Sequence, residues 1–160
     1  MKNYILITIT ALSLIACCET KKEVIETTNT SNTIYNDSLA KKIGADDYGM
    51  KKYVIAFLKR GPNKSKDSIT KANLQRAHLD NITKLAEEGK LVLAGPFFGD
   101  DDLRGIYIFN VESIEEAKKL TASDPAIQAE TLTMELKEWY GSAALVLIND
   151  LHKKISKINI

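Results

Sequence analysis

Between residues 51 and 141, short apolar runs alternate with longer stretches in which apolar residues recur every three or four positions. The short runs favour strands, and the wider spacing favours amphipathic helices. We therefore predict four strands and two helices in this part of the chain, with a short helical turn starting at Pro125 before the last strand. The strands are expected at 53–58, 91–98, 104–111 and 132–137, and the helices at 68–88 and 113–122.

Polar and small residues mark the ends of these helices. Asp67 or Ser68 is placed to cap the first helix, and Gly89 closes it. Ser113 and Glu116 have the spacing of a capping box at the start of the second helix. The sequence therefore marks both ends of the first helix and the start of the second.

The order strand, helix, strand, strand, helix, strand predicts an α+β fold of the ferredoxin-like βαββαβ type. Strands one and three are apolar on both faces, as expected of central strands. The other two carry Pro96 or a polar face, which edge strands tolerate. Because two helices cover only one face of the sheet, a second subunit or the predicted helix 143–155, capped by Ser142, has to cover the other face.

The N-terminal segment has the layout of a secretory signal: Lys2, an apolar run over 4–16, and Cys17. The sequence Leu14-Ile15-Ala16-Cys17 resembles the lipobox of bacterial lipoproteins, which implies cleavage before Cys17 and acylation of its thiol. The alternative is an ordinary cleaved signal followed by an incidental cysteine. We expect a protein of the bacterial cell envelope, held at a membrane, periplasmic or surface-facing, by lipid on Cys17.

Residues 17–50 are rich in Glu, Lys, Thr, Asn and Ser and predict a flexible tether, with room for one short helix over 37–44. The folded domain is expected at 51–141, followed by a C-terminal helix and tail over 142–160. The formal net charge of +1 gives no electrostatic footprint for nucleic acid. The expected partners are small molecules or other proteins.

Motifs for nucleotide, zinc-hydrolase and dithiol chemistry do not occur in the sequence. The histidine at position 78 stands four residues after Leu74 and four before Ile82, on the apolar stripe of the first predicted helix. It is either a core histidine or a pocket residue poised for proton transfer. Asp124 precedes Pro125 as a helix cap would, and it can also orient His78 if the two helices are adjacent.

A set of short motifs in this region resembles the YciI-like (YCII-related) family. The motifs are Tyr53-Val54-Ile55, His78-Leu79, Glu88-Gly89-Lys90-Leu91, Ala94-Gly95-Pro96, Ser113-Ile114-Glu115-Glu116-Ala117 and Asp124-Pro125. The resemblance implies a ferredoxin-like homodimer of the α+β barrel type, with a pocket where the family's histidine and aspartate meet, here His78 and Asp124. It also implies activity without a metal or organic cofactor.

The candidate substrate-binding residues are Gln75, Arg76, Gly95 and Pro96. Family members often have arginine where Gln75 stands, with Arg76 adjacent here, and glycine where Glu130 stands. Three functions stay open on the sequence: a cofactor-independent enzyme using His78 and Asp124 on an unknown small molecule, a ligand-binding lipoprotein without turnover, and a dimerising envelope scaffold.

Overall fold

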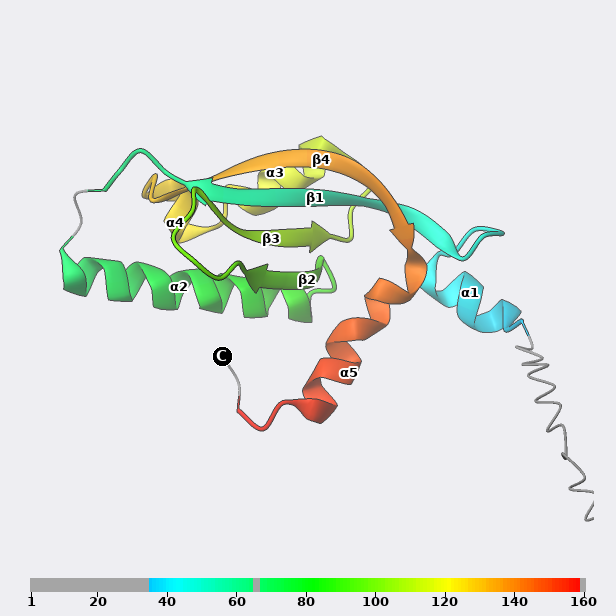
Figure 1. Ribbon diagram of the computed structural model, residues 1–160. Coiled ribbons are helices and arrows are strands. Elements are labelled where there is room, and N and C mark those ends of the chain that lie inside the picture. The colour runs from blue at the N-terminus through cyan, green and yellow to red at the C-terminus, as the bar shows by residue number, and fades with distance from the viewer. Residues whose placement is uncertain (1–34, 65–66, 159–160) are drawn as a thin grey trace, which may run out of the picture. The chain divides into compact units, whose positions relative to one another are not determined.

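The computed structural model describes residues 35–64 and 67–158 of the chain. The predicted signal segment 1–16 and the predicted lipid-bearing Cys17 lie outside the described residues. Within them, four antiparallel strands form one sheet in the order β2-β3-β1-β4, with α2 and α3 packed against it (Figure 1). The bounds are β1 Met50–Arg60, α2 Ser68–Glu87, β2 Leu91–Pro96, β3 Leu103–Phe109, α3 Ile114–Thr121, α4 Pro125–Gln128 and β4 Leu132–Ser142.

This strand order confirms the predicted ferredoxin-like βαββαβ topology. The two strands with apolar residues on both faces, β1 and β3, are central and pair with each other, for example Ala56 opposite Tyr107. The edge strands are β2, which ends at Pro96, and β4, in which half-buried and exposed residues alternate from Leu132 to Lys137. The sequence pattern therefore separates central from edge strands correctly.

The main core lies between the sheet and its two helices. Leu85 of α2 and Ala117 of α3 pack against one face of β1 and β3, where Val54 and Phe109 are fully buried. Burying an aliphatic or aromatic side chain of this size contributes about 1.5–3 kcal/mol relative to leaving it exposed. This layer fixes the position of α2 over β2 and β3, where the candidate site lies.

The second face of the sheet is covered in part by the C-terminal segment. This segment starts with the 3₁₀ helix η1, Ala143–Leu147, and continues as α5, Ile148–Ile155. Leu145 and Val146 of η1 pack on a cluster formed by Tyr53, Val92 and Ile108. Farther along the same face, Phe57 and Ile106 stay half-buried. The C-terminal segment is therefore one cover of this face, as one of the two alternatives predicted.

Several boundaries differ from the prediction. The short helix predicted over 37–44 is present as α1, Asp37–Ile43, and because it packs beside η1 the folded unit starts at Tyr35, within the expected tether. The side chain of Asn36 caps α1 by accepting a hydrogen bond from the Leu39 N–H at 2.9 Å.

The ends of other elements also shift. Strand β2 stops at Pro96 instead of Phe98, whose side chain is fully exposed in the hairpin, and β3 ends at Phe109 instead of Val111. The predicted terminal helix is divided into η1 and α5, because tertiary contacts with the sheet hold its first five residues. No helix among the described residues has the length and apolarity needed to cross a membrane.

The helix caps follow the prediction with one change. The Asp67 side chain accepts from the backbone of Ile69 and Thr70, and Ser113 Oγ accepts from the Glu116 N–H. The Glu116 carboxylate, however, accepts from the backbone N–H of Glu112 rather than that of Ser113. The second half of the capping box is thus displaced by one residue.

Candidate functional site

His78 projects from the middle of α2 toward the sheet. Its neighbours on the same helical stripe, Ile82 and Leu85, pack into the core, so the register of the helix directs the imidazole inward. The residue is buried, with 7% of its surface exposed. A histidine on this stripe lies beneath α2 and faces the central strand β3.

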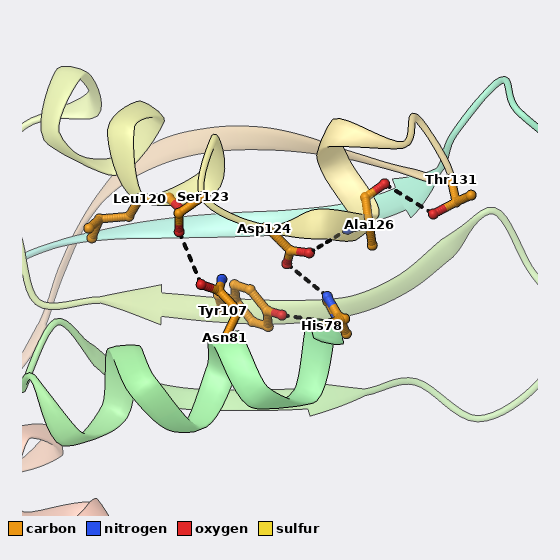
Figure 2. Close-up of polar contacts among 8 residues, drawn as sticks. All are labelled: His78, Asn81, Tyr107, Leu120, Ser123, Asp124, Ala126 and Thr131. Atoms are coloured by element: carbon orange, nitrogen blue, oxygen red, sulfur yellow. Dashed lines mark hydrogen bonds and ion pairs between the residues drawn. The ribbon is translucent and has the colours of Figure 1, made fainter. Parts of the chain in front are cut away.

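Asp124 lies between α3 and α4 and is completely buried. Its Oδ1 accepts a hydrogen bond from the Ala126 N–H at 2.8 Å, which caps α4, and its Oδ2 lies 2.7 Å from His78 Nδ1 (Figure 2). The neighbouring Ser123 donates from Oγ to Asn81 Oδ1 at 3.1 Å and so connects this loop to α2. The structure therefore brings the two predicted residues together, with the carboxylate acting as both helix cap and histidine partner.

Tyr107 of β3 is a third member of this group, and the sequence reasoning missed it. Its hydroxyl oxygen lies 3.1 Å from His78 Nε2, and its side chain is buried with 3% exposed (Figure 2). The available signal was a hydroxyl-bearing side chain within a run that is otherwise apolar on both faces. A buried tyrosine hydroxyl requires a hydrogen-bond partner, and here the partner is the imidazole.

The hydrogen-bonding roles of the three side chains follow from their chemistry. A carboxylate only accepts hydrogen bonds, so His78 Nδ1 carries a proton and donates a hydrogen bond to Asp124. In the neutral imidazole Nε2 then lacks a proton and accepts from the Tyr107 hydroxyl. The result is a line of directed hydrogen bonds from Tyr107 through His78 to Asp124.

A cavity of about 330 Å³ opens beside His78 and Tyr107. Asp124 does not line it and lies behind the imidazole. The walls are mostly apolar, and Gln75 and Arg104 add polar groups. The lining residues are Leu58, Gln75, His78, Leu79, Ile82, Ala94, Gly95, Pro96, Arg104, Gly105, Tyr107 and Leu132.

Three of the four predicted substrate-binding residues lie at this cavity, and one does not. Gln75, Gly95 and Pro96 contribute to the wall. Arg76 instead forms an ion pair with Asp80, one turn along α2, with an N–O distance of 2.8 Å. The side chain of Arg76 is about half exposed to solvent. Because the next residue on a helix points about 100° away, Gln75 and Arg76 cannot both face the cavity.

Arg104 is the cation that lines the cavity, and it was not predicted. Its guanidinium donates to the backbone carbonyls of Gly99 and Asp101 at 3.2 and 3.3 Å. It is therefore held against the β2–β3 hairpin at the cavity wall. The sequence places Arg104 only at the start of a strand, which does not indicate that its side chain reaches the cavity.

Glu130, where the resembling family often has glycine, has a positive φ of 56°. It follows α4 in the left-handed conformation that glycine adopts without steric cost. Its carbonyl accepts from the Asn63 N–H at 3.0 Å, which joins this turn to the end of β1. A glycine would suit the backbone conformation at this turn, and Glu130 does not line the cavity.

A second hollow, of about 370 Å³, lies around Asp46 and Tyr140. The Asp46 carboxylate already accepts from the backbone of Tyr48 and Met50 and from the Tyr140 hydroxyl. The hydrogen bond from Tyr140 and those from the backbone hold the pKa of Asp46 below its usual range. Since these bonds occupy the carboxylate in holding the turn before β1, this hollow is a poor candidate for chemistry.

No group of three or more His, Cys, Asp and Glu side chains suited to a metal ion occurs in the part of the chain that the structure describes. Activity without a metal or organic cofactor stays a prediction.

Burial raises the pKa of two tyrosines, which predicts a loss of stability at alkaline pH. Desolvation raises the pKa of Tyr53 to about 12, and desolvation together with the Asp124 charge raises that of Tyr107. Unfolded tyrosine ionises near pH 10, so above about pH 10 the unfolded state releases protons that the folded state retains. The free energy of unfolding should then fall by up to about 1.4 kcal/mol per pH unit for each tyrosine.

Urea unfolding at several pH values between about 8 and 11 measures this slope, because this range includes the pKa of about 10 of tyrosine in the unfolded chain. Tyr53→Phe and Tyr107→Phe should each make the fall of stability with pH shallower. For each variant, the change is measured from the free energy of unfolding of that variant at the lowest pH. Equal slopes in the wild type and both variants would show that neither phenol controls alkaline unfolding.

Comparisons with known proteins identify the family of the domain. The model of the YCII-related domain matches residues 53–140. The uncharacterized protein YjpA of Bacillus subtilis is 31% identical over 62 residues, which are 39% of this chain and 71% of that protein. A solved structure of 5-chloro-2-hydroxyhydroquinone dehydrochlorinase from Burkholderia phenoliruptrix, in complex with 2,5-dihydroxybenzoquinone, has 22% identity and a TM-score of 0.41, covering 56% of this chain and 93% of that one. With the domain match spanning more than half of its length, the chain belongs to the YCII-related domain family.

Proposed function

We propose that this YCII-related domain is a cofactor-independent enzyme that moves a proton to and from a small, largely apolar molecule bound beside His78. The observation that supports this most strongly is the line of hydrogen bonds from buried Asp124 through His78 to Tyr107, which ends at a cavity. A cavity of about 330 Å³ is large enough for a small organic molecule.

The chemistry follows from the roles of the three side chains. An acidic O–H or C–H group of the substrate gives its proton to the Tyr107 oxygen while the Tyr107 proton passes to His78 Nε2. The substrate becomes an anion, the imidazole becomes an imidazolium and Tyr107 is unchanged. Because burial raises the pKa of Tyr107, this coupled transfer avoids a free phenolate. Asp124 stabilises the imidazolium and fixes the ring orientation.

Return of the proton from His78 by the same route to another atom of the substrate completes an isomerisation. If instead the anion expels a leaving group, the reaction is an elimination, and the imidazolium returns its proton to the departing group or to solvent. The apolar walls favour either reaction, because the attraction between the imidazolium and the carboxylate is stronger in a medium of low dielectric constant.

Incubation of the protein with a metabolite pool, followed by mass spectrometry, tests this proposal. The wild type should consume a compound and release a product, and His78→Ala should not. Saturable binding without product in the wild type would favour a ligand-binding lipoprotein. Neither binding nor product would favour a scaffold.

We also propose that lipid on Cys17 holds the domain at a membrane of the cell envelope. The support is the lipobox-like sequence Leu14-Ile15-Ala16-Cys17 at the end of the apolar run. Cys17→Ser should leave the protein unprocessed or soluble, whereas the matched variant Cys18→Ser should still give an acylated, membrane-bound product. Metabolic labelling with a fatty acid and membrane fractionation measure both. Unchanged acylation of the Cys17 variant would rule out this anchor.

We further propose that the domain forms a homodimer through the part of the second sheet face that η1 leaves half-buried, around Phe57 and Ile106. These apolar side chains lie on central strands, where a second copy would bury them. Light scattering at micromolar concentration should report a dimer, and Phe57→Lys should give a monomer because it places a charge in this interface. A monomeric wild type would show that η1 and α5 alone cover the second face of the sheet.

A further inference from the structure

Helix α5 exposes an apolar stripe that the domain does not cover. Leu151 and Ile155 are 58% and 80% exposed, and none of the residues of α5 is buried. On its other side, Asn149 donates from Nδ2 to the Leu91 carbonyl at 2.8 Å and attaches the helix to the edge strand β2. The helix is therefore fixed to the domain by one side only.

The geometry of the helix directs this stripe away from the domain. With about 100° of rotation per residue, Leu151 lies about 200° from Asn149, and Ile155 lies about 40° beyond Leu151. Lys154 is about 60° from Leu151 on the same outward side. The outward surface, which we call the α5 face, consists of Leu151, Lys154 and Ile155.

The last turn of α5 is also cationic, with Lys154 on the α5 face and Lys153 on the opposite side of the helix. His152, Lys153 and Lys154 occupy the last turn of the helix and Lys157 follows it, against a single acidic residue, Asp150, in the first turn. Over residues 35–64 and 67–158, none of these three lysines forms an ion pair. Apolar side chains flanked by unpaired lysines are typical of helices that lie at a membrane surface.

The position of α5 in the fold agrees with such a role. Helix α5 continues directly from η1, and η1 packs beside α1, the first described helix. The first described helix and the C-terminal segment therefore lie at the same end of the domain (Figure 1).

We propose that the α5 face binds the surface of an anionic phospholipid bilayer, with Leu151 and Ile155 among the upper acyl chains and Lys154 at the headgroups. The proposal does not depend on the chemistry of the cavity. A second copy of the chain fits this face less well. A twofold interface would bring the two copies of Lys154 into one small contact, and three side chains on one helix fall short of the roughly 1,000 Å² that a stable interface buries.

Quenching of tryptophan fluorescence by lipids with brominated acyl chains tests this contact in the full-length chain. Trp139 is the only tryptophan, so Trp139→Phe gives a background without native signal. In that background, Leu151→Trp reports on the α5 face and Lys153→Trp, on the opposite side of the helix, is the matched control. Vesicles of phosphatidylcholine with and without phosphatidylglycerol are the probe.

Tryptophan at position 151 should be quenched several-fold more strongly than at position 153, and only in vesicles with phosphatidylglycerol. Lys154→Gln should weaken the contact by about fivefold, the contribution of one lysine near an anionic surface. Equal quenching at both positions, or none at 151, overturns the proposal. So does a wild-type chain that is dimeric in mild detergent and becomes monomeric on Leu151→Asp, because a second copy would then cover the face.

Discussion

Replacing Asp124 with alanine should lower the free energy of unfolding by about 3 kcal/mol. The variant loses the cap on the Ala126 N–H, which accounts for about 1 kcal/mol. It also leaves the His78 Nδ1–H buried without its acceptor, which costs about 1–3 kcal/mol. Both losses arise from the same buried carboxylate, so the change should be among the most destabilising single substitutions in the domain. Urea unfolding near neutral pH measures it.

Two variants separate these contributions. Asp67→Ala removes an exposed cap of α2 that has no histidine partner, and should cost only about 1 kcal/mol. Asp124→Asn retains an oxygen that can accept either hydrogen bond, and should be less destabilising than alanine. If Asp124→Ala costs no more than Asp67→Ala, the contact with His78 contributes nothing to stability and Asp124 is only a helix cap.

The fold was predictable because its signals are local. Apolar residues at every second position mark strands, and apolar residues at every third or fourth position mark helices. Apolar residues on both faces mark β1 and β3 as the central strands. The boundaries were less predictable, since tertiary contacts decide them. Helix α1 is ordered by packing beside η1, and the first five residues after Ser142 form a 3₁₀ helix against the sheet. Neither contact can be inferred from the residues concerned.

The candidate site was predictable only in part. His78 lies on the apolar stripe of α2, so periodicity alone predicts that it faces inward. Its contact with Asp124 depends on how the loop before α4 is held beside α2, and only the resemblance to a family suggested it. Tyr107 was not predicted as a site residue, because β3 is apolar on both faces and the sequence pattern does not tell which of its side chains face α2. The same uncertainty applies to Arg104.

Asp124 illustrates why structural and functional explanations of one residue need not compete. As a cap it requires a backbone N–H at Oδ1, and as a partner of His78 it uses Oδ2, so both bonds form at once. The cap fixes the carboxylate, and the fixed carboxylate orients the imidazole toward Tyr107. A residue that looks like a helix cap in the sequence can therefore position an acid–base group.

Once a substrate is identified, His78→Ala should lower kcat/KM by about 10²–10⁴-fold, the usual contribution of a general acid or base. The alanine leaves no group that can take up the proton from Tyr107, so substrate binding should be retained while turnover is lost. Free imidazole added to this variant should restore part of the rate, because removal of the ring leaves space beside the cavity. Steady-state kinetics with and without imidazole measure both effects.

Two further variants locate the proton path. Tyr107→Phe should lower kcat strongly if the proton passes through the hydroxyl, and only slightly if His78 Nε2 contacts the substrate directly. Asp124→Asn removes the charge that stabilises the imidazolium and should lower kcat with little change in KM. Full activity of His78→Ala would show that the cavity works without this histidine, and the hydrogen bonds among Asp124, His78 and Tyr107 would then serve only to hold α2 against the sheet.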